Sequence, residues 1–421
     1  MYKVFKFGGA SVKDAAAVRN VVAILSAYKS EPIVVIVSAI SKTTNALERV
    51  VNAYLRGEGD PHAALQAVKN AHYQLIQDLF EEDTQEIYES LNDTFVEIEW
   101  IIEETPEESY DYIYDQIVSI GEFLSTQIVS AYLGKMGIAN TWLDVRDVIR
   151  TDNTYRDGNV DWQDTQTRMQ RVMPDLLQQG FVITQGFIGG TSENFTTTLG
   201  REGSDYTAAI FSYCLDATTM TVWKDVAGIL TADPRLFADV TKLEHLSYRE
   251  AIEMTYYGAQ VIHPKTIKPL QNKNIPLHVR SFLMPETVGT VIDDSQTSQR
   301  YPPMIVVKPE QVLLHISTRD FSFVEEEHLS TIFALLARHR LSANMMLNTA
   351  ISFSICVNNI PERLVALQTN LHALFNLKID ENLELITIRH FDETTMQRIL
   401  QGKTVLLEEK LRNTVQFVVK V

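Results

Sequence analysis

The apolar positions of the first 300 residues form short, nearly continuous runs, separated by stretches with helical periodicity. Val- and Ile-rich runs of this length are typical of strands buried on both faces of a parallel sheet. Alternation with helices predicts a three-layer αβα domain with a mainly parallel sheet. The predicted strands are residues 2–7, 32–39, 180–190, 219–225 and 275–282. The predicted helices are residues 14–29, 45–57, 61–80, 85–104, 114–136, 205–215 and 247–258.

The pattern changes after a polar linker at 292–304, which contains the pair Pro302-Pro303. The order strand, helix, two strands, helix, strand predicts a βαββαβ module of ferredoxin-like type. Its elements are residues 311–317, 327–340, 343–349, 351–357, 361–375 and 383–388. The last 33 residues add one helix and two strands, which is a shortened second module. We therefore expect two domains, 1–298 and 305–421.

The net charge of −17 is concentrated in one segment of the chain. Residues 70–134 contain 16 Asp and Glu and no Lys or Arg, so the rest of the chain is nearly neutral. Apolar side chains recur there at helical spacing, at Ile87, Leu91, Phe95, Ile98 and Ile102. This predicts an acidic helical insertion at about 60–118 with a charged solvent face; an acidic binding surface is the alternative.

Composition excludes several classes of function. No run of 18 apolar residues is present, so no membrane span is expected, and no basic stripe indicates a nucleic-acid partner. The two cysteines, Cys214 and Cys356, are far apart and have no metal-ligand or CxxC spacing. This pattern fits a reducing cytoplasm, and no protein-held metal is expected.

The first predicted strand ends in "KFGG", with Lys6 two positions before Gly8 and Gly9. One interpretation is an ordinary glycine turn with a solvated lysine. The other is a phosphate site, where glycines let backbone N–H groups approach an anion. Polar clusters also follow other predicted strands, at 37–45, 186–190, 197–209 and 223–235. Because the carboxyl ends of parallel strands bind ligands in open α/β sheets, the clusters together favour a ligand site.

Common nucleotide-binding motifs are absent from the sequence: there is no GxxxxGK[ST], no GxGxxG after the first strand, and no protein-kinase motif set. Eight blocks along nearly the whole chain nevertheless resemble the aspartate kinase (aspartokinase) family of the amino acid kinase superfamily. They are "KFGGAS", "VSAISKTTN", "GE" at 121–122, "WLDVRDVIRTD", "VITQGFIG", "TTLGREGSDYTAA", "DVAGILTADPR" and "YYGAQVIHPKT". The terminal βαββαβ module is similar to the ACT domain of that family.

The resemblance implies an ATP-dependent phosphorylation of the β-carboxylate of L-aspartate to 4-phospho-L-aspartate. This is the first step toward lysine, threonine, methionine and diaminopimelate. It implies that Lys6 lies between the β- and γ-phosphates and that the Gly8 and Gly9 amides contact the transferred oxygens. Asp205 matches the residue that meets the substrate ammonium and helps to hold the lysine. Lys6, Gly9 and Asp205 are thus the implied catalytic set.

The remaining implied residues bind substrates. Arg201 matches the residue that grips the α-carboxylate of aspartate, for which a bidentate guanidinium is well suited. Other positions of the aspartate pocket are matched by Ser38, Thr44, Glu122, Phe187 and Ser204. The nucleotide-binding positions are matched by Lys224, Asp225, Leu230, Asp233, Arg235 and Gln260. Mg²⁺ is expected to be held mainly by the phosphates of ATP, without an assigned protein carboxylate.

Some positions depart from the family pattern. Ala10 replaces the usual Thr, Gln260 stands where a phosphate-facing lysine is usual, and Lys224 stands where Thr is common. One hypothesis is that Lys224 supplies the charge that Gln260 lacks; the alternative is that Lys224 points to solvent. These departures also leave open a second function, a catalytically weak or inactive amino-acid sensor. Acetylglutamate, glutamate and uridylate kinases share the glycine turn but lack "TTLGREGSD" followed by an ACT tail.

The ACT region raises a question of regulation. Asn344 stands where family members inhibited by lysine carry an acidic residue. An amide binds an ammonium group less strongly than a carboxylate does, so weak or absent lysine inhibition is expected. The region is expected at least to form a homodimer, because ferredoxin-like sheets pair edge to edge.

Overall fold

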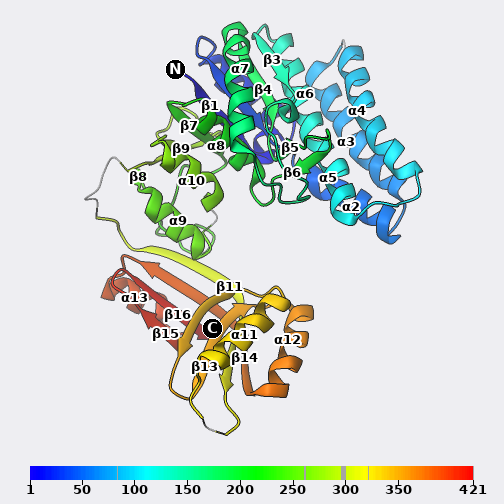
Figure 1. Ribbon diagram of the computed structural model, residues 1–421. Helices are drawn as coiled ribbons and strands as arrows, with labels where there is room; N and C mark the ends of the chain where they lie inside the picture. Colours follow the sequence, from blue (N-terminus) through cyan, green and yellow to red (C-terminus); the bar gives the residue numbers. More distant parts are fainter. Residues whose placement is uncertain (83, 260–261, 295–299, 321, 421) are drawn as a thin grey trace. The chain divides into compact units, whose positions relative to one another are not determined.

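The computed structural model describes residues 1–420 apart from 83, 260–261, 295–299 and 321 (Figure 1). The described chain divides into two compact units, which are considered separately. Unit 1 comprises 1–229, 242–252 and 262–294, and unit 2 comprises 230–241, 253–259 and 300–420. Unit 2 thus includes two short segments from within the predicted domain 1–298.

Unit 1 is built around an eight-stranded sheet of order β3-β4-β2-β1-β7-β9-β10-β8. Neighbouring strands pair in parallel except β9 and β10. The strands are β1 (Lys3–Phe7), β2 (Ile33–Val37), β3 (Asn140–Leu143), β4 (Phe181–Gln185), β7 (Thr219–Lys224), β8 (His245–Leu246), β9 (Leu277–Ser281) and β10 (Thr290–Ile292). Every residue of β2 and β4 is buried, as expected for strands covered on both faces. The predicted mainly parallel sheet is confirmed.

Helices cover both faces of this sheet (Figure 1). On one face α6 packs on β2, β3 and β4, with α3 and α4 outside it; α7 and α8 pack together on the other. The helices are α1 (Ala15–Ser26), α2 (Thr43–Arg56), α3 (Pro61–Phe80), α4 (Gln85–Glu103), α5 (Tyr110–Val118), α6 (Ile120–Lys135), α7 (Trp162–Gln179), α8 (Gly203–Cys214) and α10 (Pro264–Asn272). Helix α9 (Tyr248–Tyr256) belongs to unit 1 up to residue 252 and to unit 2 after it.

Two predicted elements of unit 1 are each divided in two. The single helix 114–136 is two helices, α5 and α6, which meet at Ser119. The single strand 180–190 is β4 followed by the short strand β5 (Ile188–Gly190). The chain turns between them because Phe187 adopts a left-handed conformation with φ 69°. Strand β5 pairs with β6 (Thr196–Thr198) as an antiparallel hairpin.

The acidic insertion is helical, as predicted. Its apolar stripe on α4 is buried, with Leu91, Phe95 and Ile98 all 0% exposed. The segment Tyr110–Lys135, which contains α5 and α6, has the length and apolar composition of a membrane-spanning helix, but 78% of its most apolar window is buried inside the protein. Buried core helices have the same composition, so this segment belongs to the core of unit 1.

Unit 2 contains a six-stranded antiparallel sheet of order β12-β13-β11-β14-β16-β15. Its strands are β11 (Met304–Ser317), β12 (Ala343–Asn348), β13 (Ser352–Asn358), β14 (Asn376–Arg389), β15 (Thr404–Lys410) and β16 (Thr414–Lys420), and its helices α11 (Glu326–Arg338), α12 (Pro361–Leu374) and α13 (Glu393–Leu400). The order of elements in the first βαββαβ module is as predicted, but the predicted strands 311–317 and 383–388 are too short, and residues 313–317 pair with 376–380. Strands β11 and β14 continue into the second half, which is completed by a core that includes Ala232 with Phe237 and Val240 packed against it.

The orientation of α4 can be tested by a matched pair of substitutions. Phe95→Ala empties a fully buried site and should lower the free energy of unfolding by about 3–5 kcal/mol. Trp100→Ala on the same helix removes a side chain that is 67% exposed and should change the free energy of unfolding by about 0.5 kcal/mol or less. Urea unfolding of both variants measures the difference. Equal destabilisation would show that α4 buries a different face.

Candidate active site

A cavity of about 490 Å³ opens at the carboxyl ends of β1 and β2 in unit 1, beside the start of α8. This is the edge at which open parallel sheets bind ligands. Nine of the sequence-predicted residues line it: Lys6, Gly9, Ser38, Thr44, Glu122, Phe187, Arg201, Ser204 and Asp205. They come from segments up to 200 residues apart, so the fold brings the separate polar clusters together.

An ion pair between Lys6 and Asp205 joins β1 to α8 at the floor of this cavity. The Lys6 Nζ lies 2.8 Å from Asp205 Oδ1, and the two side chains are 12% and 6% exposed. Burial alone would raise the pKa of the Asp205 carboxyl, but the ammonium groups of Lys6 and Lys224 more than offset it, and the pKa is lowered. Asp205 is therefore ionised, and it holds the Lys6 side chain at the carboxyl end of β1.

Glycines allow the backbone segments around the cavity to approach closely. A Cβ on Gly9 would lie 2.6 Å from the backbone oxygen of Ala39, and Ser41 N donates to Gly9 O at 3.1 Å. A side chain at Gly9 would thus separate the β1 and β2 loops. On the other wall, a Cβ on Gly186 would lie 2.4 Å from Ser204 Cβ. Without these glycines the start of α8 could not reach the strand ends.

Glu122, in the first turn of α6, places a carboxyl group in the wall of the cavity. It is 3% exposed, and its Oε2 has no hydrogen-bond partner among the described residues. Burial raises its pKa to about 8, although the backbone N–H groups of Ala39 and Gly186 and the Lys6 ammonium act to lower it. Glu122 is therefore mostly protonated at pH 7, and a cationic group entering the cavity would favour its ionisation.

Arg201 is exposed at the rim of the same cavity. Its guanidinium makes no ion pair or hydrogen bond with the described part of the chain, so its donors are available to a ligand carboxylate. Gly8 directly follows β1 and precedes the 3-10 turn η1 (Gly9–Val12). The N–H groups of Gly8 and Gly9 therefore lie beyond the end of the strand.

The predicted nucleotide residues divide between the two units. Lys224 ends β7 in unit 1, is half-buried, and its charge acts on Asp205, which argues against a lysine directed to solvent. Asp225 follows it and is exposed. Leu230, Asp233 and Arg235 belong to unit 2 and are described apart from the cavity; there Asp233 and Arg235 pair through two-point contacts of 2.6 and 3.0 Å. Gln260 lies outside the described residues.

Sequence reasoning missed several residues of the cavity wall, including Tyr114, Arg156, Thr198 and Glu202. Asp115, which is fully buried, organises three of these segments. Its carboxylate accepts from Arg156 N, Thr198 N and Thr198 Oγ1, each at 2.8 Å. Burial raises its pKa to about 6, while these hydrogen bonds lower it. The only signal in the sequence is a lone acid within the apolar run 113–120.

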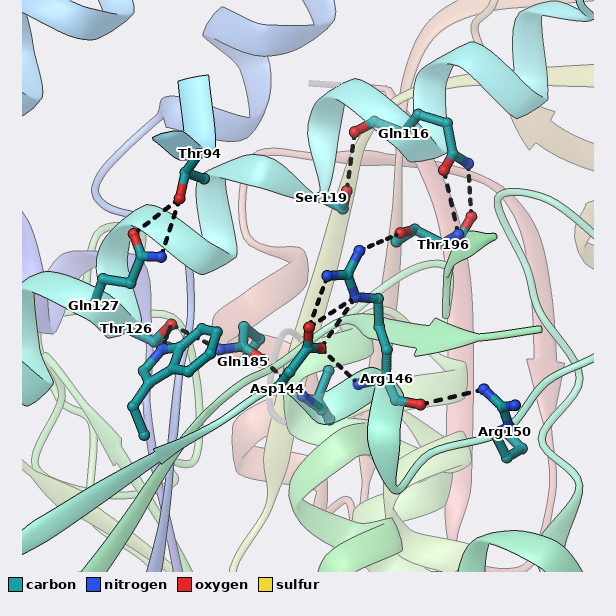
Figure 2. A network of polar contacts seen from close by, with 12 residues as sticks. Thr94, Gln116, Ser119, Thr126, Gln127, Asp144, Arg146, Arg150, Gln185 and Thr196 are labelled. Carbon is teal, nitrogen blue, oxygen red and sulfur yellow. Dashed lines mark hydrogen bonds and ion pairs between the residues drawn. The ribbon is translucent and has the colours of Figure 1, made fainter. Parts of the chain in front are cut away.

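A polar network joins α5, the 3-10 turn η2 (Val145–Asp147) and strand β6 (Figure 2). Arg146, in η2, is held by Asp144 and donates to Thr196 Oγ1 at 3.0 Å. Gln116 on α5 donates to Thr196 O and accepts from Thr196 N. Arg146 of the block "WLDVRDVIRTD" and Gln116 of α5 therefore both hold strand β6 at Thr196, two residues before the cavity-lining Thr198.

Comparison with known proteins identifies the family of this chain. Residues 1–281 match the amino acid kinase family. Lysine-sensitive aspartokinase 3 of Escherichia coli is 29% identical over 392 residues, 91% of this chain and 86% of the relative. Chloroplastic aspartokinase 3 of Arabidopsis thaliana is 30% identical over 424 residues, 97% of this chain and 74% of the relative. The chain covers only 32% of the length of a bifunctional aspartokinase/homoserine dehydrogenase from the same plant, to which it is 33% identical over 299 residues.

Solved structures agree with the sequence relatives. Crystal structures of Escherichia coli aspartokinase III, one in complex with lysine and aspartate and one with aspartate and ADP, have TM-scores of 0.84 and 0.82. Both are 27% identical, and the alignments cover 100% of this chain and 96% of theirs. The similarity thus extends over both units.

The protonation state of Glu122 makes a testable prediction. A carboxyl whose pKa is raised in the folded state stabilises the fold below its unfolded pKa of about 4.5 and loses that contribution as pH rises through about 8. Glu122→Gln cannot ionise, so its free energy of unfolding relative to wild type should rise between about pH 5 and 8 and then level off. Chemical denaturation of both proteins across this range measures it. A constant difference would mean that Glu122 is ionised throughout.

Proposed function

Because the chain belongs to the amino acid kinase family and, within it, to the aspartokinases, we propose that it transfers the γ-phosphoryl group of ATP to the β-carboxylate of L-aspartate. The product is 4-phospho-L-aspartate, and the enzyme is a phosphotransferase with a carboxyl acceptor. The observation that carries this proposal is the buried Lys6–Asp205 ion pair in one cavity with the available guanidinium of Arg201.

Aspartate binding follows from the charges of the cavity. The Arg201 guanidinium receives the α-carboxylate through two parallel hydrogen bonds. The α-ammonium lies between Asp205 and the Oε2 of Glu122, which loses its proton as the ammonium arrives. Ser38, Thr44, Phe187 and Ser204 fill the remaining wall and fix the orientation of the side chain. The β-carboxylate is then left facing the end of β1.

Phosphoryl transfer requires little covalent chemistry from the protein. The attacking β-carboxylate is ionised at pH 7, so no general base is needed. Two anions must approach each other, and charge spreads over the transferred oxygens. The Lys6 ammonium and the N–H groups of Gly8 and Gly9 neutralise that charge from fixed positions at the strand end. Asp205 keeps Lys6 there, so the cation is placed before ATP binds.

The nucleotide is assigned to Lys224 and Asp225 of unit 1, while Leu230, Asp233 and Arg235, which the family resemblance also implies, belong to unit 2. Lys224 is the residue we propose to replace the family lysine that is Gln260 in this chain. Its charge already acts on Asp205, so it lies close enough to act on a phosphate as well. Mg²⁺, held chiefly by phosphate oxygens, neutralises part of the triphosphate charge when bound.

Regulation and assembly are proposed on the geometry of unit 2. Lys308 Nζ lies 3.1 Å from Asn344 Oδ1, and the Asn344 amide donates at 2.7 Å to both Gln311 and Asn358. The Asn344 Oδ1 thus already accepts a hydrogen bond from the ammonium group of Lys308. This leaves it less able to bind a free lysine, which supports weak lysine inhibition. The edge strand β12 exposes Met346 and Leu347 and supports a homodimer formed edge to edge.

A cytoplasmic location is also proposed. Cys214 and Cys356 are both free and buried, and burial raises the pKa of each thiol to about 12. Neither is arranged for a disulfide, which agrees with a reducing compartment. We assign no membrane or nucleic-acid partner to the enzyme.

Lys6→Met tests the proposed activity. Loss of the cation from the strand end should lower kcat by about 100-fold or more. Lys29→Met, which removes an exposed cation elsewhere in unit 1, should leave kcat unchanged. Hydroxylamine trapping of the acyl phosphate with ATP and Mg²⁺ measures both. Binding of ATP without turnover in the wild-type chain would support the amino-acid sensor instead, and turnover only with another carboxylate would reassign the substrate.

Lysine inhibition tests the assignment in unit 2. Wild-type activity should show little change with L-lysine, because Lys308 occupies the amide of Asn344. Lys308→Met should make that amide available and increase any sensitivity to lysine. Activity is titrated with lysine at fixed aspartate. Inhibition of the wild-type enzyme at low micromolar lysine would overturn the assignment.

A further inference from the structure

A second cationic cavity lies in unit 1 outside the proposed catalytic residues. It is a groove of about 380 Å³ between the start of α2 and the middle of α3, here called the α2–α3 groove. Its floor is apolar and includes Ile40, Val68 and Leu75. Three cations line it, Lys13, Lys42 and Arg49, and the described residues of its lining include no acid. A volume of this size fits a small organic molecule.

None of the three cations is engaged by the part of the chain that the structure describes. Lys13, Lys42 and Arg49 are exposed and make no ion pair or side-chain hydrogen bond within the described ranges. The two nearest acids in sequence are directed elsewhere. Asp14 accepts from Ala17 N at 2.8 Å as the cap of α1, and Glu48 acts on Tyr110 and Tyr114 of α5. In a chain of net charge −17, such a cluster attracts an anion.

The backbone adds to this attraction. Helix α2 has 14 residues and begins at Thr43, after Lys42, whose side chain makes no capping hydrogen bond. The first N–H groups of a helix carry partial positive charge and readily bind an anion when no side chain caps them. The N–H of Thr43 already donates to Ile40 O at 2.9 Å, so the end of α2 adds its partial positive charge to that of the three cations.

An independent observation comes from His72 in the groove wall. Its side chain is 1% exposed, and its Nε2 has no hydrogen-bond partner among the described residues. The Nδ1 atom lies 2.8 Å from Val68 O, and a carbonyl can only accept, so Nδ1 carries the proton. Nε2 is thus a hydrogen-bond acceptor without a donor among the described residues, in a neutral ring. It suits a hydroxyl donor and is unfavourable to an anionic oxygen.

We propose that the α2–α3 groove binds a small phosphate monoester that carries a hydroxyl group. The phosphate lies at the start of α2 among Lys13, Lys42 and Arg49, since a doubly charged group matches three cations better than a single carboxylate does. The hydroxyl donates to His72 Nε2, which is buried beneath the groove wall, once the side chains that cover it move aside. Ser41 lines both this groove and the catalytic cavity, so the ligand contacts the same turn that packs against Gly9.

Isothermal titration of the full chain with glycerol 3-phosphate and with inorganic phosphate tests the site. We expect one glycerol 3-phosphate per chain, with affinity that falls as salt concentration rises. Lys13→Gln and Arg49→Gln should each weaken it by about tenfold. Lys29→Gln, an exposed cation outside the groove, should not change it. His72→Phe keeps an aromatic ring against Phe95 and should reduce the affinity for glycerol 3-phosphate to that for phosphate.

Two results would overturn the site. One is the absence of saturable binding of either probe up to about 10 mM, a concentration at which even a weak specific site is occupied. The other is binding that Arg201→Ala abolishes and Arg49→Gln leaves intact, which would place the anion in the catalytic cavity. Thermal unfolding of each variant checks that it is folded. None of these measurements requires kinase activity, so their outcome is independent of the proposed function.

Discussion

The ion pair between Lys6 and Asp205 is the contact on which the rest of the site depends. Both groups are nearly removed from water, which is costly unless each charge has a partner at short distance. Loss of either partner would leave an uncompensated buried charge. The pair also joins the first strand to helix α8, so the same contact that supports the fold places an ammonium group where a phosphate is expected.

Close approach of backbone segments makes this contact possible. Gly186 and Gly203 leave room for the start of α8, since a Cβ on either would lie within 2.6 Å of Ser204 or Phe187. Gly9 does the same for the loops after β1 and β2. The cavity wall also contains a neutral Glu122, so an unliganded site does not hold a second carboxylate charge beside that of Asp205. The charges of Lys6 and Asp205 are therefore in place before substrates bind.

Much of this arrangement could be predicted from local patterns. Buried Val- and Ile-rich runs indicated the sheet, and polar clusters at strand ends indicated the edge where ligands bind. Helix α7 was missed because "WQDTQTRMQRVMPDLLQQ" buries only a narrow stripe and contains Pro174 in its interior. The prediction of one helix over 114–136 was wrong, because the continuous apolar composition gives no sign of the break between α5 and α6 at Ser119.

Residues that act through distant contacts could not be predicted. Asp115 bonds to Arg156, 41 positions away, and to Thr198, 83 positions away, and no sequence motif links them. Likewise, nothing local indicates that Ala232 packs in the core of unit 2. Such assignments require the tertiary fold, because the partner is determined by which strands are neighbours and not by spacing along the chain.

The central claim is that the Lys6 ammonium binds the phosphates of ATP while Asp205 holds the Lys6 side chain in position. A crystal structure with L-aspartate and a non-hydrolysable ATP analogue tests it most directly. We expect the Lys6 Nζ at about 3 Å from both the Asp205 carboxylate and an oxygen of the terminal phosphates. A Lys6 side chain directed away from the triphosphate, with the nucleotide bound in place, would contradict this account.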